Sequence, residues 1–422
     1  MEFEAKGKRT RASISSFTVG DRLSSLPDCL IHHIMSFMKA RQVVQTCVLS
    51  TRWKHLWRSV PSLNIDLEEF KTEGAYHANV EERKKFEDFT DHLLIPNNIS
   101  IALLDKFQLH VHHYHREEAA RWIRHGIKYS TQEPGIRPQG LSSTPWRLKR
   151  LHLSNINLDD SFAKHISSGC QNLEDLELKG CPCHFHEITS HTLKNLILKD
   201  CSSNVLSAIT SQTLKRLVIS GCYIDDGPLV VMAPVVSYLL LSVAIYNFKG
   251  GIVLNEIPSI VKVSIHLVNN SDCPSKLGDD QFNLLDSVSK VTSLHLSAYK
   301  AMVWLSVLTE EFPQFENLKT LLLEKCDLSD NFQTLGHFLQ SSPSLEKLTL
   351  RNCKFSKDPK KKKGKVKLNK QSLSQLDVRC KNLKQTEIIY RNDDVHKLEE
   401  LLLSIAGSLP ENNIKLTKVD SP

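Results

Sequence analysis

The most regular feature of the chain is a pattern of apolar positions, Leu-x-x-Leu-x-Leu, that recurs between residues 148 and 350. Successive copies are 20 to 31 residues apart, and they begin at Leu148, Leu173, Leu193, Leu214, Val236, Ile260, Val291, Leu318 and Leu345. Apolar residues at alternate positions predict a short strand with one buried face. One such strand cannot bury its leucines alone, whereas stacked copies share a single core. The pattern therefore predicts parallel strands whose intervening residues face a concave surface.

These copies resemble leucine-rich repeats, whose period is about 20–29 residues. The resemblance implies an α/β fold with a solenoid over residues 147–379. A cysteine follows the strand in several copies, at Cys181, Cys201, Cys222, Cys326 and Cys353. We interpret these thiols as small core residues at the bend after each strand, in preference to redox or metal-binding groups.

A second pattern, with a helical period, covers the stretch from Leu26 to Trp57. Pro27 suits the first turn of a helix, and Ser50 can cap a later one. Apolar residues at helical spacing mark three short helices, with Leu30, Ile31, Ile34, Phe37 and Met38 on the first, Val43, Val44 and Cys47 on the second, and Trp53, Leu56 and Trp57 on the third. About 40 residues cannot bury so much apolar surface alone, so we expect the stretch to pack against another part of the chain.

This stretch resembles an F-box, the helical module that docks on the Skp-type adaptor of cullin–RING ubiquitin ligases. The resemblance rests on the opening Leu26-Pro27-Asp28 and on Val48-Leu49-Ser50 followed by Arg52-Trp53 and Leu56-Trp57, an ending similar to plant members. It implies an F-box over residues 21–63. The residues expected to line or support the adaptor face are Leu26, Pro27, Leu30, Ile31, Ile34, Val44, Val48, Leu49 and Trp53. The alternative is a three-helix cap without an adaptor partner.

One departure from the F-box pattern is Ala40-Arg41-Gln42, where family members commonly have a proline or an acidic residue. It affects only the turn between helices.

The rest of the chain divides into three segments. Residues 1–20 are polar and partly basic, which predicts disorder. Residues 64–146 read as a connecting segment with the first irregular repeats, including a helix over Glu81–Leu94 and a strand over Phe107–Val111. Residues 380–422 loosely resemble the FBD-type segment of plant F-box proteins, with a strand over Leu383–Tyr390 and a helix capped by Asp394. This segment lacks the glycine often found between that strand and helix, and we interpret it as a cap on the open end of the array.

The net charge of +7 is concentrated in one place. Residues 354–370 contain nine lysines and one acid, so the rest of the chain is close to neutral. We therefore expect no general nucleic-acid-binding surface. The lysine run is expected to be a solvated loop, and a nuclear-import signal is the functional alternative, formed by Lys360, Lys361, Lys362, Lys363, Lys365 and Lys367.

Other functional classes find little support in the sequence. The first twenty residues have no apolar core, so no secretory signal is expected and the eleven cysteines are expected to be reduced. Gly227–Phe248 lacks charge, but two prolines and the repeat register favour strands over a membrane span. The residues Cys181–His186 and His110–His115 lack the ligand spacing of a tetrahedral metal site. No phosphate-binding loop or nucleophile elbow is present, and we expect no enzyme activity, metal or cofactor.

Taken with the resemblance, these features predict the substrate-recognition subunit of an SCF-type cullin–RING ubiquitin ligase. The F-box would dock the Skp-type adaptor, and through it a cullin, while the repeats bind an unknown target protein. The alternative is a non-proteolytic scaffold that uses the adaptor only for assembly. The outward positions of the repeats show no evident pocket for a small molecule, and the expected location is the nucleus, the cytoplasm or both.

Overall fold

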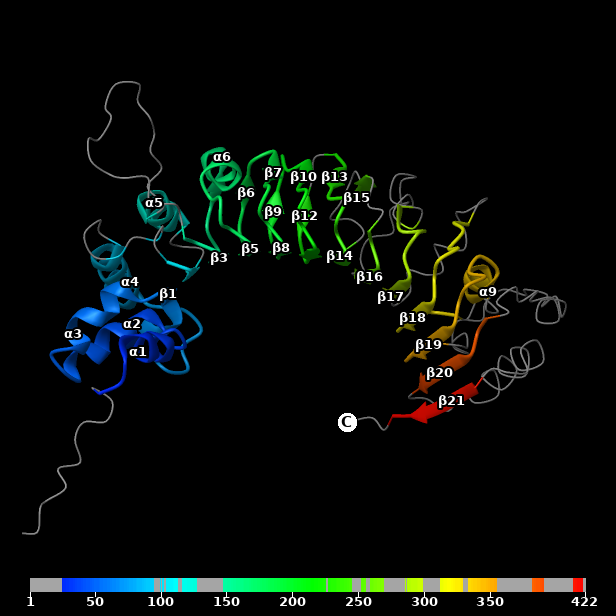
Figure 1. The fold of residues 1–422 in the computed structure, drawn as a ribbon, viewed down its shortest axis with the longest axis horizontal. Coiled ribbons are helices and arrows are strands. Elements are labelled where there is room, and N and C mark those ends of the chain that lie inside the picture. Colours follow the sequence, from blue (N-terminus) through cyan, green and yellow to red (C-terminus); the bar gives the residue numbers. More distant parts are fainter. Residues whose placement is uncertain are drawn as a thin grey trace, which may run out of the picture.

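The computed structural model describes residues 25–94, 99, 101, 104–112, 116–126, 147–224, 227–244, 252–255, 259–268, 285, 287–298, 312–328, 333–354, 382–390 and 413–419. Short helices at the N-terminal end lead into a long arc of parallel strands (Figure 1). This arrangement confirms the predicted α/β class and the predicted solenoid.

The first helices follow closely on one another: α1 (Asp28–Met35), α2 (Ala40–Gln45), the 3-10 helix η1 (Thr46–Val48), α3 (Trp53–Leu56) and the 3-10 helix η2 (Trp57–Ser59). The hydroxyl of Ser50 accepts a hydrogen bond from the backbone N–H of Trp53 at 3.3 Å, as expected for a residue that caps α3. The backbone N–H of Lys39 donates to the side-chain oxygen of Gln42 at 3.3 Å. Gln42 therefore stabilises the start of α2, at the turn where the sequence departs from the F-box pattern.

A thirteen-stranded parallel sheet forms the inner side of the arc (Figure 1). Its strands, in spatial order, are β1 (Ser62–Asp66), β2 (Lys106–His110), β3 (Arg150–Ser154), β5 (Asp175–Lys179), β8 (Asn195–Lys199), β11 (Arg216–Ser220), β14 (Tyr238–Ala244), β16 (Lys262–Val268), β17 (Ser293–Ala298), β18 (Thr320–Glu324), β19 (Lys347–Arg351), β20 (Gln385–Tyr390) and β21 (Asn413–Lys418). A strand stands at each of the nine predicted copies, from β3 to β19. β21 was not predicted.

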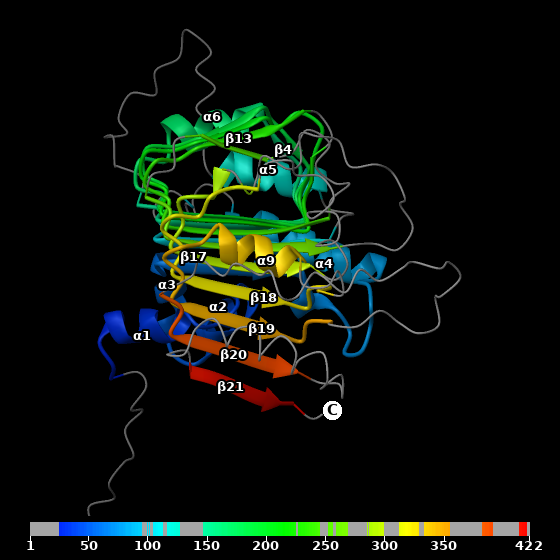
Figure 2. The same cartoon turned by 90° about the vertical axis from the view of Figure 1, so that its right-hand side faces the viewer.

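The outer side of the arc carries shorter strands and helices (Figures 1 and 2). One parallel sheet contains β7 (Glu187–Thr189), β10 (Ala208–Thr210), β13 (Leu229–Met232) and β15 (Ile252–Asn255). Two strand pairs are β4 (Leu158–Asp159) with β6 (Cys183–His184) and β9 (Ser202–Ser203) with β12 (Tyr223–Ile224). The helices are η3 (Leu67–Phe70), α4 (Val80–Leu94), α5 (Arg116–Gly126), α6 (Asp160–Ser168) and α9 (Gln333–Gln340).

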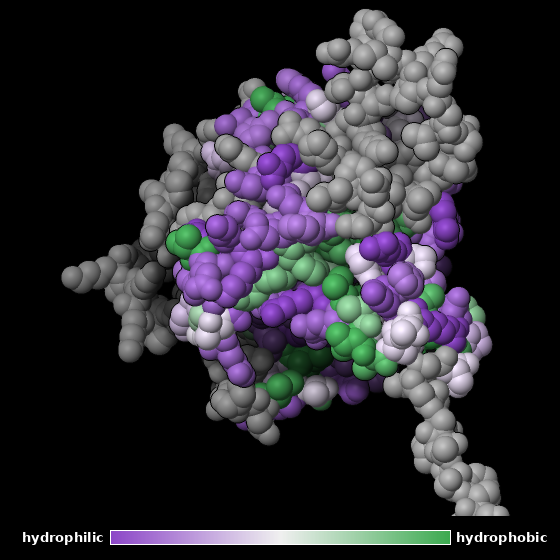
Figure 3. Space-filling model, turned by 90° about the vertical axis from the view of Figure 1, so that its left-hand side faces the viewer, coloured by the Kyte–Doolittle hydropathy of each residue, from purple (hydrophilic) through white to green (hydrophobic). Residues whose placement is uncertain are grey.

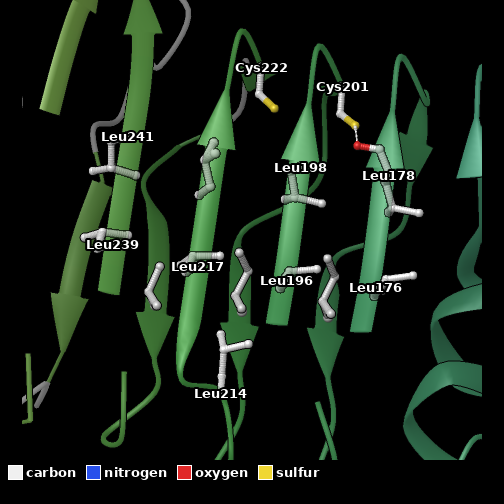
Figure 4. Close-up of a cluster of buried hydrophobic side chains, with 14 of the residues drawn as sticks. Leu176, Leu178, Leu196, Leu198, Cys201, Leu214, Leu217, Cys222, Leu239 and Leu241 are labelled. Atoms are coloured by element: carbon white, nitrogen blue, oxygen red, sulfur yellow. Dashed lines mark hydrogen bonds between the residues drawn. The ribbon is translucent and has the colours of Figure 1, made fainter. Parts of the chain in front are cut away.

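The core lies between the two sides and consists mainly of the repeat leucines. In Figure 4 the leucines of neighbouring strands point to the same side and stack from one repeat to the next. Leu176, Leu196 and Leu217, one from each of three successive strands, are at most 2% exposed. Each buried leucine contributes about 1.5–3 kcal/mol, so the stacking of repeats supplies the main stabilisation.

The cysteines after the strands are core residues that also connect neighbouring repeats. The thiol of Cys201 donates to the backbone oxygen of Leu178, in the preceding repeat, at 3.4 Å (Figure 4). Cys326 makes the same contact with Leu296 at 3.6 Å. These contacts explain why a small, weakly polar residue is present after the strand.

The described part of the uncharged run, residues 227–244, forms strands β13 and β14, in register with the repeat before it. Among the described residues, no helix is long and apolar enough to cross a membrane. The predicted C-terminal helix near Asp394 lies outside the described residues, as do residues 1–20 and 355–370.

Candidate functional site

The N-terminal helices expose apolar side chains that a folded protein usually buries. Val48 is 83% exposed, Phe37 78% and Leu49 56%, and beside them Leu30 and Ile34 are more than a third exposed. Figure 3 faces this end of the molecule and shows apolar residues gathered among polar ones. We call Leu30, Ile34, Phe37, Val48 and Leu49 the apolar patch. Several large apolar side chains exposed on one small group of helices mark an interaction site.

A small core directly beneath holds the patch in shape. It consists of Ile31, Met35, Val43, Trp53 and Val60, each at most 3% exposed. The helical period of α1 explains the division, because it directs Leu30 and Ile34 outward and the next residues, Ile31 and Met35, inward. Truncation of a buried member would therefore alter the patch through its support.

The nine residues predicted for the adaptor face separate accordingly. Leu30, Ile34, Val48 and Leu49 belong to the apolar patch, and Pro27 is exposed beside them. Ile31 and Trp53 are buried support, and Leu26 and Val44 are partly buried. Phe37 was missing from the predicted set, although its position on the first apolar helical face was visible in the sequence.

α2 joins these helices to the repeat array. Ala40 is 1% exposed and belongs to the main core of the solenoid together with Leu63 and Ile65 of the edge strand β1. Three residues further on, Val43 belongs to the small core of the N-terminal helices. One helix thus contributes to both cores, which agrees with the expectation that the N-terminal stretch packs against another part of the chain.

Polar contacts reinforce this junction. The ammonium group of Lys39 lies 2.7 Å from a carboxylate oxygen of Asp66 at the end of β1. The hydrogen bond to Asp66 raises the pKa of Lys39 above its ordinary value. The guanidinium of Arg41 donates to the backbone oxygen of Glu69 and lies 5.0 Å from the ring centre of Phe70. These contacts orient the apolar patch relative to the concave face.

The concave face contains a hollow of about 460 Å³ over strands β14 to β20. Its lining comes from outward strand positions: Tyr238, Leu240, Lys262, Ser264, His266, Ser293, His295, Thr320, Leu322, Lys347, Thr349, Arg351 and Glu387, with Leu294 beside them. The sequence showed no evident pocket at these positions and left the question open, whereas the structure shows an open hollow there. Reading the outward positions across the copies in register would have placed Arg216, Tyr238 and Lys262 in one row.

Two histidines lie on the floor of this hollow. The rings of His266 and His295 meet edge to face, with centres 4.7 Å apart, and Nε2 of His295 is 3.1 Å from a carboxylate oxygen of Glu324. Burial lowers the pKa of both histidines below the ordinary value of 6.5. Both imidazoles are therefore neutral at pH 7.

Two buried cysteines are unsuited to nucleophilic chemistry, and the described residues contain no cluster of metal ligands. The cysteines in this part of the chain are free thiols, and burial raises the pKa of Cys170 and of Cys181 to about 12. Thiols with such pKa values are poor nucleophiles. No group of three or more possible metal ligands occurs in the described residues, which include Cys181–His186 but not His113 or His115.

The proposed import lysines, residues 360–363, 365 and 367, lie outside the described residues. Their role, and the location in nucleus or cytoplasm, stay predictions.

Comparison with known proteins finds matches at both ends of the chain. The family model of the F-box domain matches residues 23–64, and the model of the leucine-rich repeats of the FBD-associated F-box protein At5g56370 matches residues 266–420. The chain is 31% identical to the rice protein MEIOTIC F-BOX protein MOF (Oryza sativa subsp. japonica), over 95% of this chain and 86% of the relative.

Two relatives from Arabidopsis thaliana are more distant. The putative F-box/LRR-repeat protein At4g00320 is 26% identical over 78% of this chain and 71% of its own length. The F-box/FBD/LRR-repeat protein At1g78750 is 24% identical over 82% and 80%, respectively.

Proposed function

Because this chain belongs to the plant family of F-box proteins with leucine-rich repeats, we propose that it is the substrate-recognition subunit of an SCF-type cullin–RING ubiquitin ligase. The F-box docks the Skp-type adaptor, which connects the chain to a cullin. The repeats bind the target protein, and the chain itself performs no chemistry.

The observation that carries this proposal is the apolar patch. It presents Phe37 and Val48, both more than three quarters exposed, on a rigid support within the stretch matched by the F-box model. Burial of a few such side chains in a partner is how a small surface gains affinity. Burial of the apolar patch in an apolar groove of a helical adaptor is therefore more favourable than its exposure to water.

The junction at α2 supports the second half of the proposal. A receptor accelerates ubiquitin transfer by raising the effective concentration of a target lysine near the charged enzyme. This effect requires a defined geometry between the adaptor surface and the target surface. The contribution of α2 to both cores, through Ala40 and Val43, provides that geometry.

The test is co-purification of a Skp-type adaptor with the full chain carrying Val48→Asp. A carboxylate at the centre of an apolar interface stays unpaired on binding, so we expect adaptor binding to fall by at least about 100-fold. Val80→Asp is the matched control, because Val80 is 72% exposed at the start of α4, outside the patch. Both variants should melt at the temperature of the unmodified chain.

Adaptor binding that survives Val48→Asp would contradict the assignment. Adaptor binding without a cullin in the purified complex would instead favour the non-proteolytic scaffold.

A further inference from the structure

The hollow on the concave face combines leucines, imidazoles and hydroxyl groups on its floor with cations at its rim. Leu240 and Leu322 lie in the middle row of the sheet, and the ring of Tyr238 stands in the row beside them. Hydroxyl groups of Ser264, Ser293, Thr320 and Thr349 line the same space. The hollow can therefore contact an extended peptide through both apolar and hydrogen-bonding groups.

Tyr238 stands between two cations of the neighbouring strands. Arg216, Tyr238 and Lys262 are register partners on β11, β14 and β16. The guanidinium carbon of Arg216 is 5.1 Å from the centre of the ring, and the ammonium nitrogen of Lys262 is 5.9 Å from it. Both distances allow a cation–π interaction, which holds the two charges beside the hollow without neutralising them.

Of the two carboxylates near the hollow, Glu387 is paired with cations and Glu324 with a neutral imidazole. Glu387 lies 3.9 Å from the ammonium group of Lys347 and 3.8 Å from that of Lys415, and Glu324 contacts His295. Within the described part of the chain, Arg216, Lys262 and Arg351 have no carboxylate within 4.0 Å. These three cations are available to a ligand.

The lining carries net positive charge. The lining groups Lys262, Lys347, Arg351 and Glu387 together carry a charge of +2 because the imidazoles are neutral. Glu324, which contacts the neutral His295 from the same face, lowers this charge to +1. The folded body outside the lysine run is close to neutral, so this charge is local. Two acids on the concave face of β5, Asp175 and Glu177, lie further along the arc.

We propose that this hollow binds an acidic segment of the target protein, an extended stretch in which an apolar side chain lies between carboxylates. This inference rests on the target-binding role proposed above. The carboxylates contact Arg216, Lys262 and Arg351, and the apolar side chain packs on Tyr238 and the leucine floor. A nucleic acid fits less well, because leucines, hydroxyl groups and the carboxylate of Glu387 interrupt the cations of the lining, whereas a phosphate backbone needs a continuous series of basic groups.

The test uses the full chain purified with its adaptor and a fluorescein-labelled peptide of Glu-Glu-Leu repeats. Fluorescence anisotropy should show binding that weakens as salt is raised, whereas a Gln-Gln-Leu peptide should not bind. Lys262→Glu and Arg351→Glu should each weaken binding about tenfold or more, because each replaces an attractive charge by a repulsive one. Lys84→Glu is the matched control, an exposed lysine on α4 away from the concave face.

Three results would overturn this inference. The Glu-Glu-Leu peptide fails to bind, or Lys84→Glu weakens its binding as much as Lys262→Glu, or a labelled single-stranded oligonucleotide binds more tightly and loses affinity in the same variants. Each leaves adaptor co-purification unaffected and so does not count against the ligase role. Conversely, if the chain binds the peptide but fails to bind the adaptor, the ligase role is contradicted and the peptide-binding inference is not.

Discussion

At the scale of single residues, a left-handed backbone conformation recurs in the turns that end the strands. The residue directly after the strand has a positive φ between 52° and 65° in Asn155, Gly180, Asp200, Gly221, Lys325 and Asn352. The backbone N–H of this residue donates to a carbonyl near the end of the strand in the next repeat, as Gly221 does to Ser242 at 2.8 Å. The left-handed conformation lets the chain turn while keeping that bond, which favours Gly, Asn and Asp.

Substitution of Gly221 tests how closely this turn is packed. An alanine Cβ would overlap the carboxylate of Asp200 in addition to straining the backbone. We expect Gly221→Ala to lower the free energy of unfolding by about 2–3 kcal/mol. Gly227→Ala is the control, because Gly227 also has a positive φ, 76°, but nothing within 4 Å of its would-be Cβ. Gly227→Ala should lower the free energy of unfolding by about 1 kcal/mol. Urea denaturation measures both variants, and equal losses would show that the overlap with Asp200 contributes nothing.

At the scale of elements, the strands have one face for stability and one for binding. In β14 the side chains of Leu239 and Leu241 are fully buried, whereas the neighbouring Tyr238 and Leu240 are partly exposed on the concave face. This alternation explains how an uncharged run of residues forms ordinary solenoid strands. The inward positions are constrained by the core, and the outward positions are free to vary with the ligand.

Two adjacent leucines of β14 allow a direct comparison of these faces. Leu239→Ala removes a fully buried side chain and should lower the free energy of unfolding by about 2–5 kcal/mol. Leu240→Ala makes the same chemical change on the concave face and should cost less than about 1 kcal/mol. Thermal unfolding followed by circular dichroism measures both. Similar losses would mean that Leu240 also belongs to the core.

At the scale of the whole molecule, the N-terminal helices and the solenoid behave as one body because α2 is shared. Ala40 contributes to the solenoid core, and the pair Lys39–Asp66 closes the junction at its edge. A partner bound at the apolar patch is thereby held in a constant orientation to the concave face. The two binding surfaces are coupled by the packing and the polar contacts at this junction.

Insertion of a large side chain at this junction tests the coupling. Ala40→Trp overfills the space between α2 and β1 and should destabilise the protein by about 1–3 kcal/mol. Hydrogen exchange should become faster in β1 and stay unchanged in distant strands such as β18. Gln45→Trp, at an exposed position of the same helix, should do neither. Equal exchange in the two variants would argue against a shared core.

The repeats and the F-box pattern were readable from the sequence because both depend on local periodicity. Alternate leucines specify a buried strand face, and their recurrence specifies a stack, so strands β3 to β19 could be predicted one by one. The helical spacing of Leu30 and Ile34 likewise predicted an apolar helix, and the resemblance to the F-box assigned these two residues to the adaptor face. Such patterns arise wherever burial repeats with the period of the backbone.

The hollow and the junction became visible only with the three-dimensional structure. Tyr238, Lys262, Arg351 and Glu387 are far apart in sequence, and only the register of successive strands brings them to one surface. Their positions face outward and carry no constraint from the core, so no periodic pattern distinguishes them. In the same way, the placement of Ala40 against β1 depends on packing between distant segments.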